Sequence, residues 1–250
     1  MHVRSAGRAA VVAGLAIAAL SGPAFAQGPS AADQQIRTKV VHRLTDQDIL
    51  RAHDLTIAVS HGVVTLAGTV PTLHDRREAV DETRDVDGVQ EVVSRLQVMA
   101  GESDRDVAER VARQIRRYVF YTVFDNVNVN VKNGVVTLLG QVTSPFKKRE
   151  MADLVERVPG AQAVQNDLDV LPTSFYDDEL REAVASRIYN DPLFFNDSLV
   201  PTPPVHIIVD DSHVTLVGVV SDRMERIRAG MLARDVFGVL GVTNDLRVES

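Results

Sequence analysis

Two groups of side chains in this sequence are suited to contact with a membrane surface. Three consecutive basic residues, Lys147, Lys148 and Arg149, open a predicted helix, and basic residues recur at matching places elsewhere in the chain. Aromatic candidates lie where other predicted helices end: Phe120, Tyr121, Phe124, Phe194 and Phe195. Basic residues attract anionic headgroups and aromatic rings suit the headgroup boundary, so we predict lipid contact by both groups. For the aromatic residues, packing in the core is the favoured alternative, and a solvated helix face is the alternative for the basic ones.

Patterns typical of enzymes and metal sites are missing from the sequence. The chain has seven His and no Cys, and no two His have the spacing of a zinc-binding helix. There is no nucleophile elbow and no glycine-rich loop that would hold a phosphate. We therefore predict a protein that is not an enzyme, with no cofactor and no metal.

The first 26 residues are predicted to be a cleaved secretion signal. Arg4 and Arg8 precede the apolar run Ala9–Leu20, and Ala24-Phe25-Ala26 forms a small-x-small cleavage site. The alternative is an uncleaved anchor, but the run is shorter than the ~20 residues that a spanning helix needs. The net charge of the whole chain is −7, and removal of the two arginines makes it more negative. We expect a periplasmic protein that does not bind nucleic acid, because phosphate contacts require a basic face.

An internal repeat determines the predicted architecture. Gly62-Val-Val-Thr-Leu-Ala-Gly68 returns as Gly134-Val-Val-Thr-Leu-Leu-Gly140 and again as Ser212-His-Val-Thr-Leu-Val-Gly218. Twenty residues after the last glycine of each copy comes another glycine, followed by a run such as Val164–Val170. The glycines that we expect to determine the fold are Gly62, Gly68, Gly88, Gly134, Gly140, Gly160, Gly218 and Gly238.

Each copy is predicted to be an αββαβ unit of an α+β fold. An amphipathic helix comes first, then a hairpin of two strands, a second helix and a third strand parallel to the second. Thr72, Ser144 and Asp222 are the predicted N-caps of the second helices. Gly140 and its equivalents should let that helix approach the sheet closely, and Gly160 and its equivalents should end the helix. The predicted units, each a three-stranded mixed sheet with two helices on one face, are residues 34–99, 104–171 and 177–248.

These repeated residues resemble the BON domain, named for bacterial osmotically induced and nodulation proteins. The resemblance rests on the strand-Gly-Val-Thr-Leu-x-Gly core, the helix that ends at Gly, and the closing Val-x-Asn-x-Leu-x-Val at Val164–Val170 and Val242–Val248. Copy one departs from it at Ser94, and copy three at Ser212 and with extra residues around 196–204. The resemblance implies an envelope location and a non-enzymatic role connected with phospholipid membranes, envelope integrity and osmotic stress.

Function is therefore predicted at the level of a surface rather than an active site. We expect a non-catalytic periplasmic protein that associates with phospholipid or with envelope proteins and supports envelope integrity or the response to osmotic stress. The alternatives are a stress protein that binds a small ion, such as potassium, or a solute, and an adaptor that self-associates. The asparagines Asn166 and Asn244 should point toward the helices and bond to a backbone group there.

Overall fold

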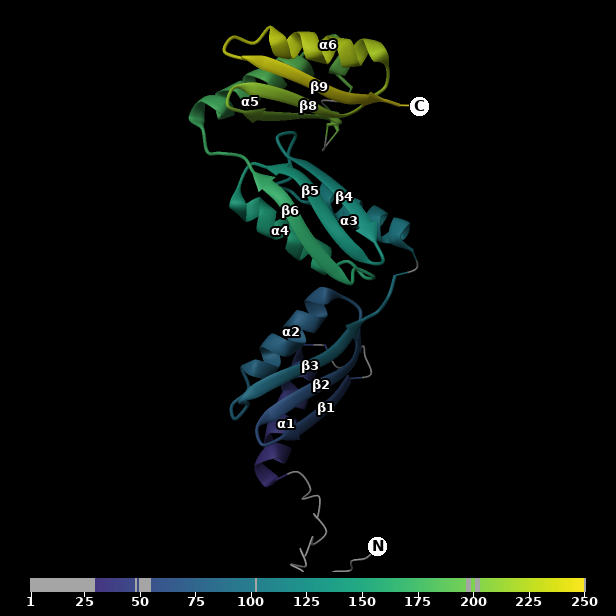
Figure 1. The fold of residues 1–250 in the computed structure, drawn as a ribbon, viewed down its shortest axis with the longest axis vertical. Coiled ribbons are helices and arrows are strands. Elements are labelled where there is room, and N and C mark those ends of the chain that lie inside the picture. Colours follow the sequence, from purple (N-terminus) through teal and green to yellow (C-terminus); the bar gives the residue numbers. More distant parts are fainter. Residues whose placement is uncertain are drawn as a thin grey trace, which may run out of the picture.

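The computed structural model describes residues 30–47, 49, 55–101, 103–196, 199–200 and 203–249, so the predicted signal at 1–26 lies outside the described residues. Three units follow one another along the long axis of the molecule (Figure 1). Unit 1 contains α1 (Ala31–Asp46), β1 (Leu55–Ser60), β2 (Val63–Val70), α2 (Leu73–Arg84) and β3 (Glu91–Val98). Unit 2 contains α3 (Asp104–Arg117), β4 (Asn126–Lys132), β5 (Val135–Val142), α4 (Pro145–Glu156) and β6 (Ala163–Val170). Unit 3 contains α5 (Phe175–Tyr189), the 3-10 helix η1 (Pro192–Phe194), β7 (Val205–Asp210), β8 (His213–Val220), α6 (Arg223–Arg234) and β9 (Gly241–Val248).

The predicted α+β architecture and strand directions are confirmed. In each unit the first two strands form an antiparallel hairpin, and the third strand lies parallel to the second on its other side. The two helices of a unit pack against each other and against the sheet. Alternation along the central strand buries Val136, Leu138 and Val142 in unit 2, which is how an alternating strand covers a core on one face.

The second helices begin where the sequence predicts. Each begins at a side chain that accepts a hydrogen bond from a backbone N–H group of the helix. Thr72 and Asp75 form a capping box at α2, and the side chains of Ser144 and Asp222 accept from backbone N–H groups of α4 and α6. The prediction that the second helices end at the repeated glycines was inexact. The helix α4 ends at Glu156, and Gly160, with φ +93°, lies in the turn that follows.

The predicted reason for Gly140 was wrong. Its φ is +119°, and a Cβ there would lie 2.1 Å from the backbone oxygen of Asn126 on the neighbouring strand. A Cβ at Gly218 would likewise clash with the carbonyl oxygen of Pro204. These glycines therefore serve the approach of two strands rather than the approach of a helix, and the left-handed φ excludes a β-branched side chain as well.

A repeated acidic residue ties the first helix of each unit to its hairpin. The carboxylate of Asp33 accepts from Gly62 N, and Asp177 accepts from Ser212 N. Asp104 accepts from both Asn133 N and Gly134 N at 2.8 Å. The Gly62 N–H is the main cause that lowers the pKa of Asp33. Gly62, Asn133, Gly134 and Ser212, which have left-handed φ in the hairpins, thus keep their N–H groups satisfied.

The buried side chains form two clusters. One runs continuously through units 1 and 2, from Ile36 to Leu168, and the other lies in unit 3, from Leu180 to Leu246. Between units 1 and 2 the tail of unit 1 docks on unit 2, where Ala100 bridges Gly160 and Gln162 Nε2 donates to the Met99 carbonyl at 2.9 Å. The helices α2 and α4 are joined across the same junction by Arg77, which pairs with Asp153 and Glu156.

Candidate membrane-contact surface

The predicted aromatic residues divide between the interior and the surface. Phe194 is fully buried in the core of unit 3, so the prediction that it contacts a membrane is wrong. Phe124 is partly buried and packs from unit 2 against the same core. The ring of Tyr121 lies 5.5 Å from that of His206 in unit 3, and burial raises the pKa of Tyr121 to about 12. Tyr121 and Phe124 are thus parts of the junction between units 2 and 3, as the core-packing alternative expects.

Lys147 is engaged within unit 2. Its Nζ lies 2.6 Å from Oδ2 of Asp125, whose side chain is fully buried, and 13% of the Lys147 side chain is exposed. Asp125 also accepts hydrogen bonds from the backbone N–H and hydroxyl groups of Thr122 and Thr143. Because the Lys147 charge compensates a buried carboxylate, it is not available to a headgroup. Lys148 is half-buried and Arg149 is exposed.

One part of the predicted unit 2 surface is exposed as expected. Phe120 is 55% exposed and its ring packs edge-on against Phe146, which is 48% exposed and stands directly before Lys147. The structure therefore brings the aromatic junction to the start of α4. Phe146 was missed in the sequence, although its place in the first turn after Ser144 was visible. Phe195 is also exposed, on the loop that follows η1.

A further group of exposed apolar side chains lies on unit 3, at positions where the sequence predicted no membrane contact. Met224, Ile227 and Met231 are spaced three and four residues apart on α6 and are 67%, 53% and 49% exposed. Such spacing places them on one face of the helix, which we name the α6 stripe. At the C-terminal end of α6, the loop carries Phe237 and Leu240, which are 97% and 73% exposed.

The α6 stripe is bordered by arginine. The helix contains four Arg, at 223, 226, 228 and 234, and one acidic residue, Glu225, in a chain whose net charge is −7. Arg228 is held by Asp191 at 2.7 Å, whereas Arg223 and Arg234 are exposed at the two ends of the stripe. The helix lies at the end of the row of units, on the side of unit 3 away from unit 2 (Figure 1). A flat surface could therefore reach it without obstruction by the other units.

Comparison with known proteins establishes the family. The model of the BON domain matches three times, over residues 32–100, 103–172 and 176–250. This chain belongs to the BON domain family. "Osmotically-inducible protein Y" of Escherichia coli (strain K12) is 29% identical over 143 residues, which are 54% of this chain and 71% of that protein.

Among solved structures, proteins of type III secretion systems match this chain at low similarity. The C-terminal domain of CdsD, a structural protein of the system in Chlamydia trachomatis, is 13% identical, and the match covers 85% of this chain and 96% of that one, with a TM-score of 0.25. A periplasmic domain of PrgH from S. typhimurium is 12% identical, and the match covers 79% and 99%, with a TM-score of 0.20.

The described residues contain no group of three or more His, Cys, Asp or Glu side chains placed to hold a metal ion. Nor does any helix within these residues have the length and apolar character needed to cross a bilayer.

Both asparagines of the closing strands bond to helix backbone, as predicted. Asn166 Nδ2 donates to the Lys148 carbonyl at 2.6 Å, and Asn244 Nδ2 donates to the Arg226 carbonyl at 2.7 Å. Their Oδ1 atoms accept from the N–H groups of Leu168 and Leu246. Their amide groups therefore join the third strand to the second helix and are structural.

Proposed function

We propose that this protein is a non-catalytic, periplasmic member of the cell envelope that associates with anionic phospholipid surfaces and takes part in the response to osmotic stress. We assign the principal contact to the α6 stripe with Phe237 and Leu240. The exposed stripe bordered by arginine is the observation that carries the proposal. The predicted secretion signal and the name of the E. coli relative support the periplasmic location and the connection with osmotic stress.

Burial of apolar side chains and attraction between opposite charges would together hold the protein on an anionic membrane. Lipid burial of one Ile or Met side chain stabilises by roughly 1.5–3 kcal/mol, reduced in proportion to the area that is already covered in the free protein. Exposed arginines at the ends of the stripe would extend toward headgroups while their stems lie along the apolar boundary. Each basic residue near an anionic surface contributes about 1 kcal/mol, a contribution that salt screens.

The unit 2 surface is a second, smaller candidate for the same function. Phe120 and Phe146 supply exposed rings, and Arg149, three residues after Phe146 on α4, supplies an exposed charge. Because Lys147 pairs with Asp125, this surface has less positive charge than the sequence suggested. We expect it to contribute less to binding than unit 3.

The test is cosedimentation of residues 27–250 with phosphatidylcholine vesicles, with and without phosphatidylglycerol, across a salt series. Ile227→Glu with Met231→Glu should weaken binding by about 2–4 kcal/mol, since two apolar contacts are lost and two repulsive charges are added. The matched control is Val135→Glu with Leu139→Glu, which adds the same charges at exposed apolar positions of β5 and should bind as the parent does.

Three outcomes would contradict the proposal or part of it. Failure of the parent to bind any vesicle would favour an envelope protein as the partner. Equal binding by parent and by the Ile227/Met231 variant would remove the assignment to unit 3. Dimerisation of the parent that is lost in the same variant, without vesicle binding, would favour the self-associating adaptor.

A further inference from the structure

One edge of each three-stranded sheet is formed by the third strand of its unit, β3, β6 or β9. In a parallel pair, alternate residues of a strand direct both of their backbone groups toward the neighbouring strand. Met99 N donates to the Val70 carbonyl of β2, and the alternate residues that precede Met99 in β3 point the same way. The residues between them direct their backbone groups to the free edge of the sheet: Val92, Ser94, Leu96 and Val98.

In units 2 and 3 an asparagine side chain occupies this edge. The Oδ1 atom of Asn166 accepts from Leu168 N, the outward N–H group at the middle of β6. The Oδ1 atom of Asn244 accepts from Leu246 N of β9 in the same way, and Arg226 donates to the Asn244 carbonyl. A backbone group that already has a partner is unavailable to an added strand, so these side chains hinder pairing at β6 and β9.

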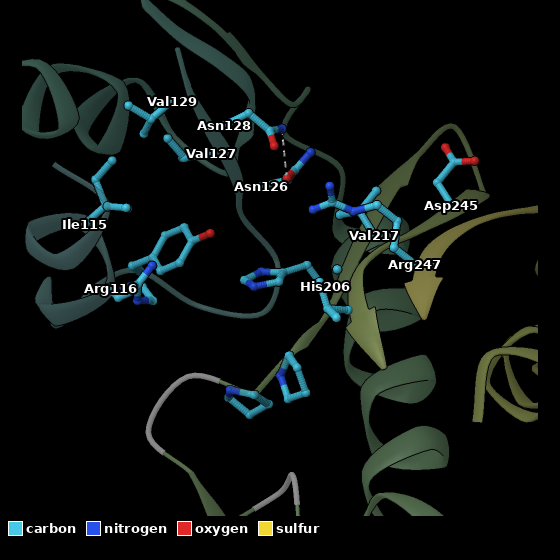
Figure 2. Close-up of a pocket in the computed structure, with 16 residues that line it drawn as sticks. Ile115, Arg116, Asn126, Val127, Asn128, Val129, His206, Val217, Asp245 and Arg247 are labelled. Carbon is cyan, nitrogen blue, oxygen red and sulfur yellow. Dashed lines mark hydrogen bonds between the residues drawn. The ribbon is translucent and has the colours of Figure 1, made fainter. Parts of the chain in front are cut away.

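The surroundings of β6 and β9 also disfavour an added strand. Asp167 and Asp169 are exposed on the outer face of β6, and a second copy of β6 in antiparallel register would place these carboxylates opposite one another. On β9 the outer face carries Asp245 and Arg247, which lie across a cleft of about 510 Å³ from β4 of unit 2 (Figure 2). Part of the space beside this face is therefore occupied by unit 2.

The edge of unit 1 is open by comparison. Ser94 stands where units 2 and 3 have asparagine, and its side chain makes no hydrogen bond with any residue that the structure describes. The outward N–H of Leu96 therefore lacks the side-chain acceptor that Leu168 and Leu246 have. The strand β3 is eight residues long, and an open strand edge is a surface on which a further strand can pair.

The side chains of β3 are complementary to a second copy of the same strand. On the outer face Glu91, Val93 and Arg95 follow one another at every second residue, and both charged side chains are exposed. Antiparallel pairing about Val93 would place Glu91 of each copy opposite Arg95 of the other. The backbone groups would be in register as well, because Val92 would then exchange both hydrogen bonds with Ser94 of the second copy. Within the described part of the chain neither charged side chain has an ion pair to lose.

We propose that two copies of this protein pair through β3, antiparallel and about a two-fold axis at Val93. The two sheets of unit 1 would then form one continuous sheet, and each contact would occur twice. Unit 3 lies at the other end of the row of units, so both α6 stripes of such a dimer would remain accessible (Figure 1). A dimer could therefore present two membrane contacts instead of one, which would raise the avidity for a vesicle.

Sedimentation velocity of residues 27–250 over about a hundredfold range of protein concentration tests the pairing. We expect the parent to form a monomer–dimer equilibrium. Ser94→Asn should weaken association about tenfold or more, because the amide would occupy Leu96 N at both copies of the edge, as asparagine does in units 2 and 3. This variant should fold, since both other units carry asparagine at the equivalent position.

An exchange of charges tests the register. Arg95→Glu should weaken association about tenfold, because like charges would lie opposite each other at two places in the dimer. Adding Glu91→Arg to the Arg95→Glu chain should restore association. The matched control is Asp245→Arg, a charge reversal at the equivalent position of β9, which should leave association unchanged.

Several results would overturn the proposal. A parent that is monomeric at every concentration would overturn pairing with a second copy and leave the edge of β3 to a strand of another protein. Equal association by the parent and by Ser94→Asn would show that β3 is not the interface. Association that persists in Ser94→Asn but is lost in the Ile227/Met231 variant would place the interface on the α6 stripe. A doubly exchanged chain that stays monomeric would overturn the register about Val93.

Discussion

The second helices of the three units share one position in the fold but differ on the face turned away from their own sheets. Residues 77, 149 and 227 are equivalent by the spacing of the repeated glycines, and they are Arg, Arg and Ile; residues 81, 153 and 231 are Asp, Asp and Met. On α2 and α4 these positions carry charge, and Arg77 pairs with Asp153 across the junction of units 1 and 2. On α6 they are apolar and exposed. Positions shared by the units therefore carry the fold, whereas this variable face determines what each unit contacts.

The largest expected effect tests the shared positions. Gly140→Val should lower the free energy of unfolding by about 3 kcal/mol or more, because φ is left-handed and the added Cβ meets the Asn126 carbonyl. Urea denaturation of the variant checks this. Leu139→Val, at the exposed neighbouring position, is the control and should change stability little. An unchanged midpoint for the Gly140 variant would show that strand contact does not require glycine there.

A somewhat smaller effect is expected at a feature particular to unit 2. Lys147→Met should lower the free energy of unfolding by about 3 kcal/mol at neutral pH, because the buried Asp125 loses its counter-charge while other donors remain. Lys148→Met is the matched control. Vesicle binding by the two folded variants should be alike. A stable Lys147 variant with weaker vesicle binding would restore the original membrane assignment of this residue.

The variable face can be tested by exchange. In the background of Ile227→Glu and Met231→Glu, Arg149→Ile with Asp153→Met would give α4 the apolar pattern of α6 beside the exposed Phe146. We expect this exchange to recover about 1–2 kcal/mol of vesicle binding, the value of partly burying two apolar side chains. Cosedimentation measures the recovery. No recovery would mean that the position of unit 3 in the row matters more than the residues of the stripe.

The smallest effect is expected for the charged pair itself. Arg77→Ala should cost less than about 1 kcal/mol of unfolding free energy, because its side chain is 45% exposed and exposed ion pairs are weak. Thermal denaturation at low and high salt would check this value. A loss of several kcal/mol would indicate that the α2–α4 contact, rather than the shared core, holds units 1 and 2 together.

Much of the fold follows from local patterns in the sequence, whereas the site depends on long-range contacts. The repeated strands and the caps at Thr72 and Ser144 could be predicted because each depends on a few neighbouring residues. The partner of Lys147 could not, since Asp125 lies 22 residues away and its burial is a tertiary property. The bond between the first helix and the hairpin of each unit is also a long-range contact, but its acidic residue can be recognised in the sequence. Asp33, Asp104 and Asp177 each stand three residues before the first buried apolar residue of their helix.

The burial of individual aromatic residues could not be predicted from the sequence either. Phe194 and Phe195 are adjacent and identical in type, yet one is fully buried and the other is 61% exposed. The α6 stripe was overlooked because Met224, Ile227 and Met231 occur in a helix whose other apolar residues, such as Ala229 and Leu232, do face the core. Apolar periodicity identifies a helix. It does not show whether a second apolar face of that helix packs against the rest of the protein or is exposed to solvent.

The continuous core of units 1 and 2 has a consequence for how the chain loses its structure. Unit 1 and unit 2 share buried side chains and a docked tail, so neither can open without exposing part of the other. Unit 3 has a core of its own and is attached through a few contacts around Tyr121, Phe124 and Val123. On heating, the molecule should melt in two cooperative steps rather than three, with the first two repeats behaving as one thermodynamic body.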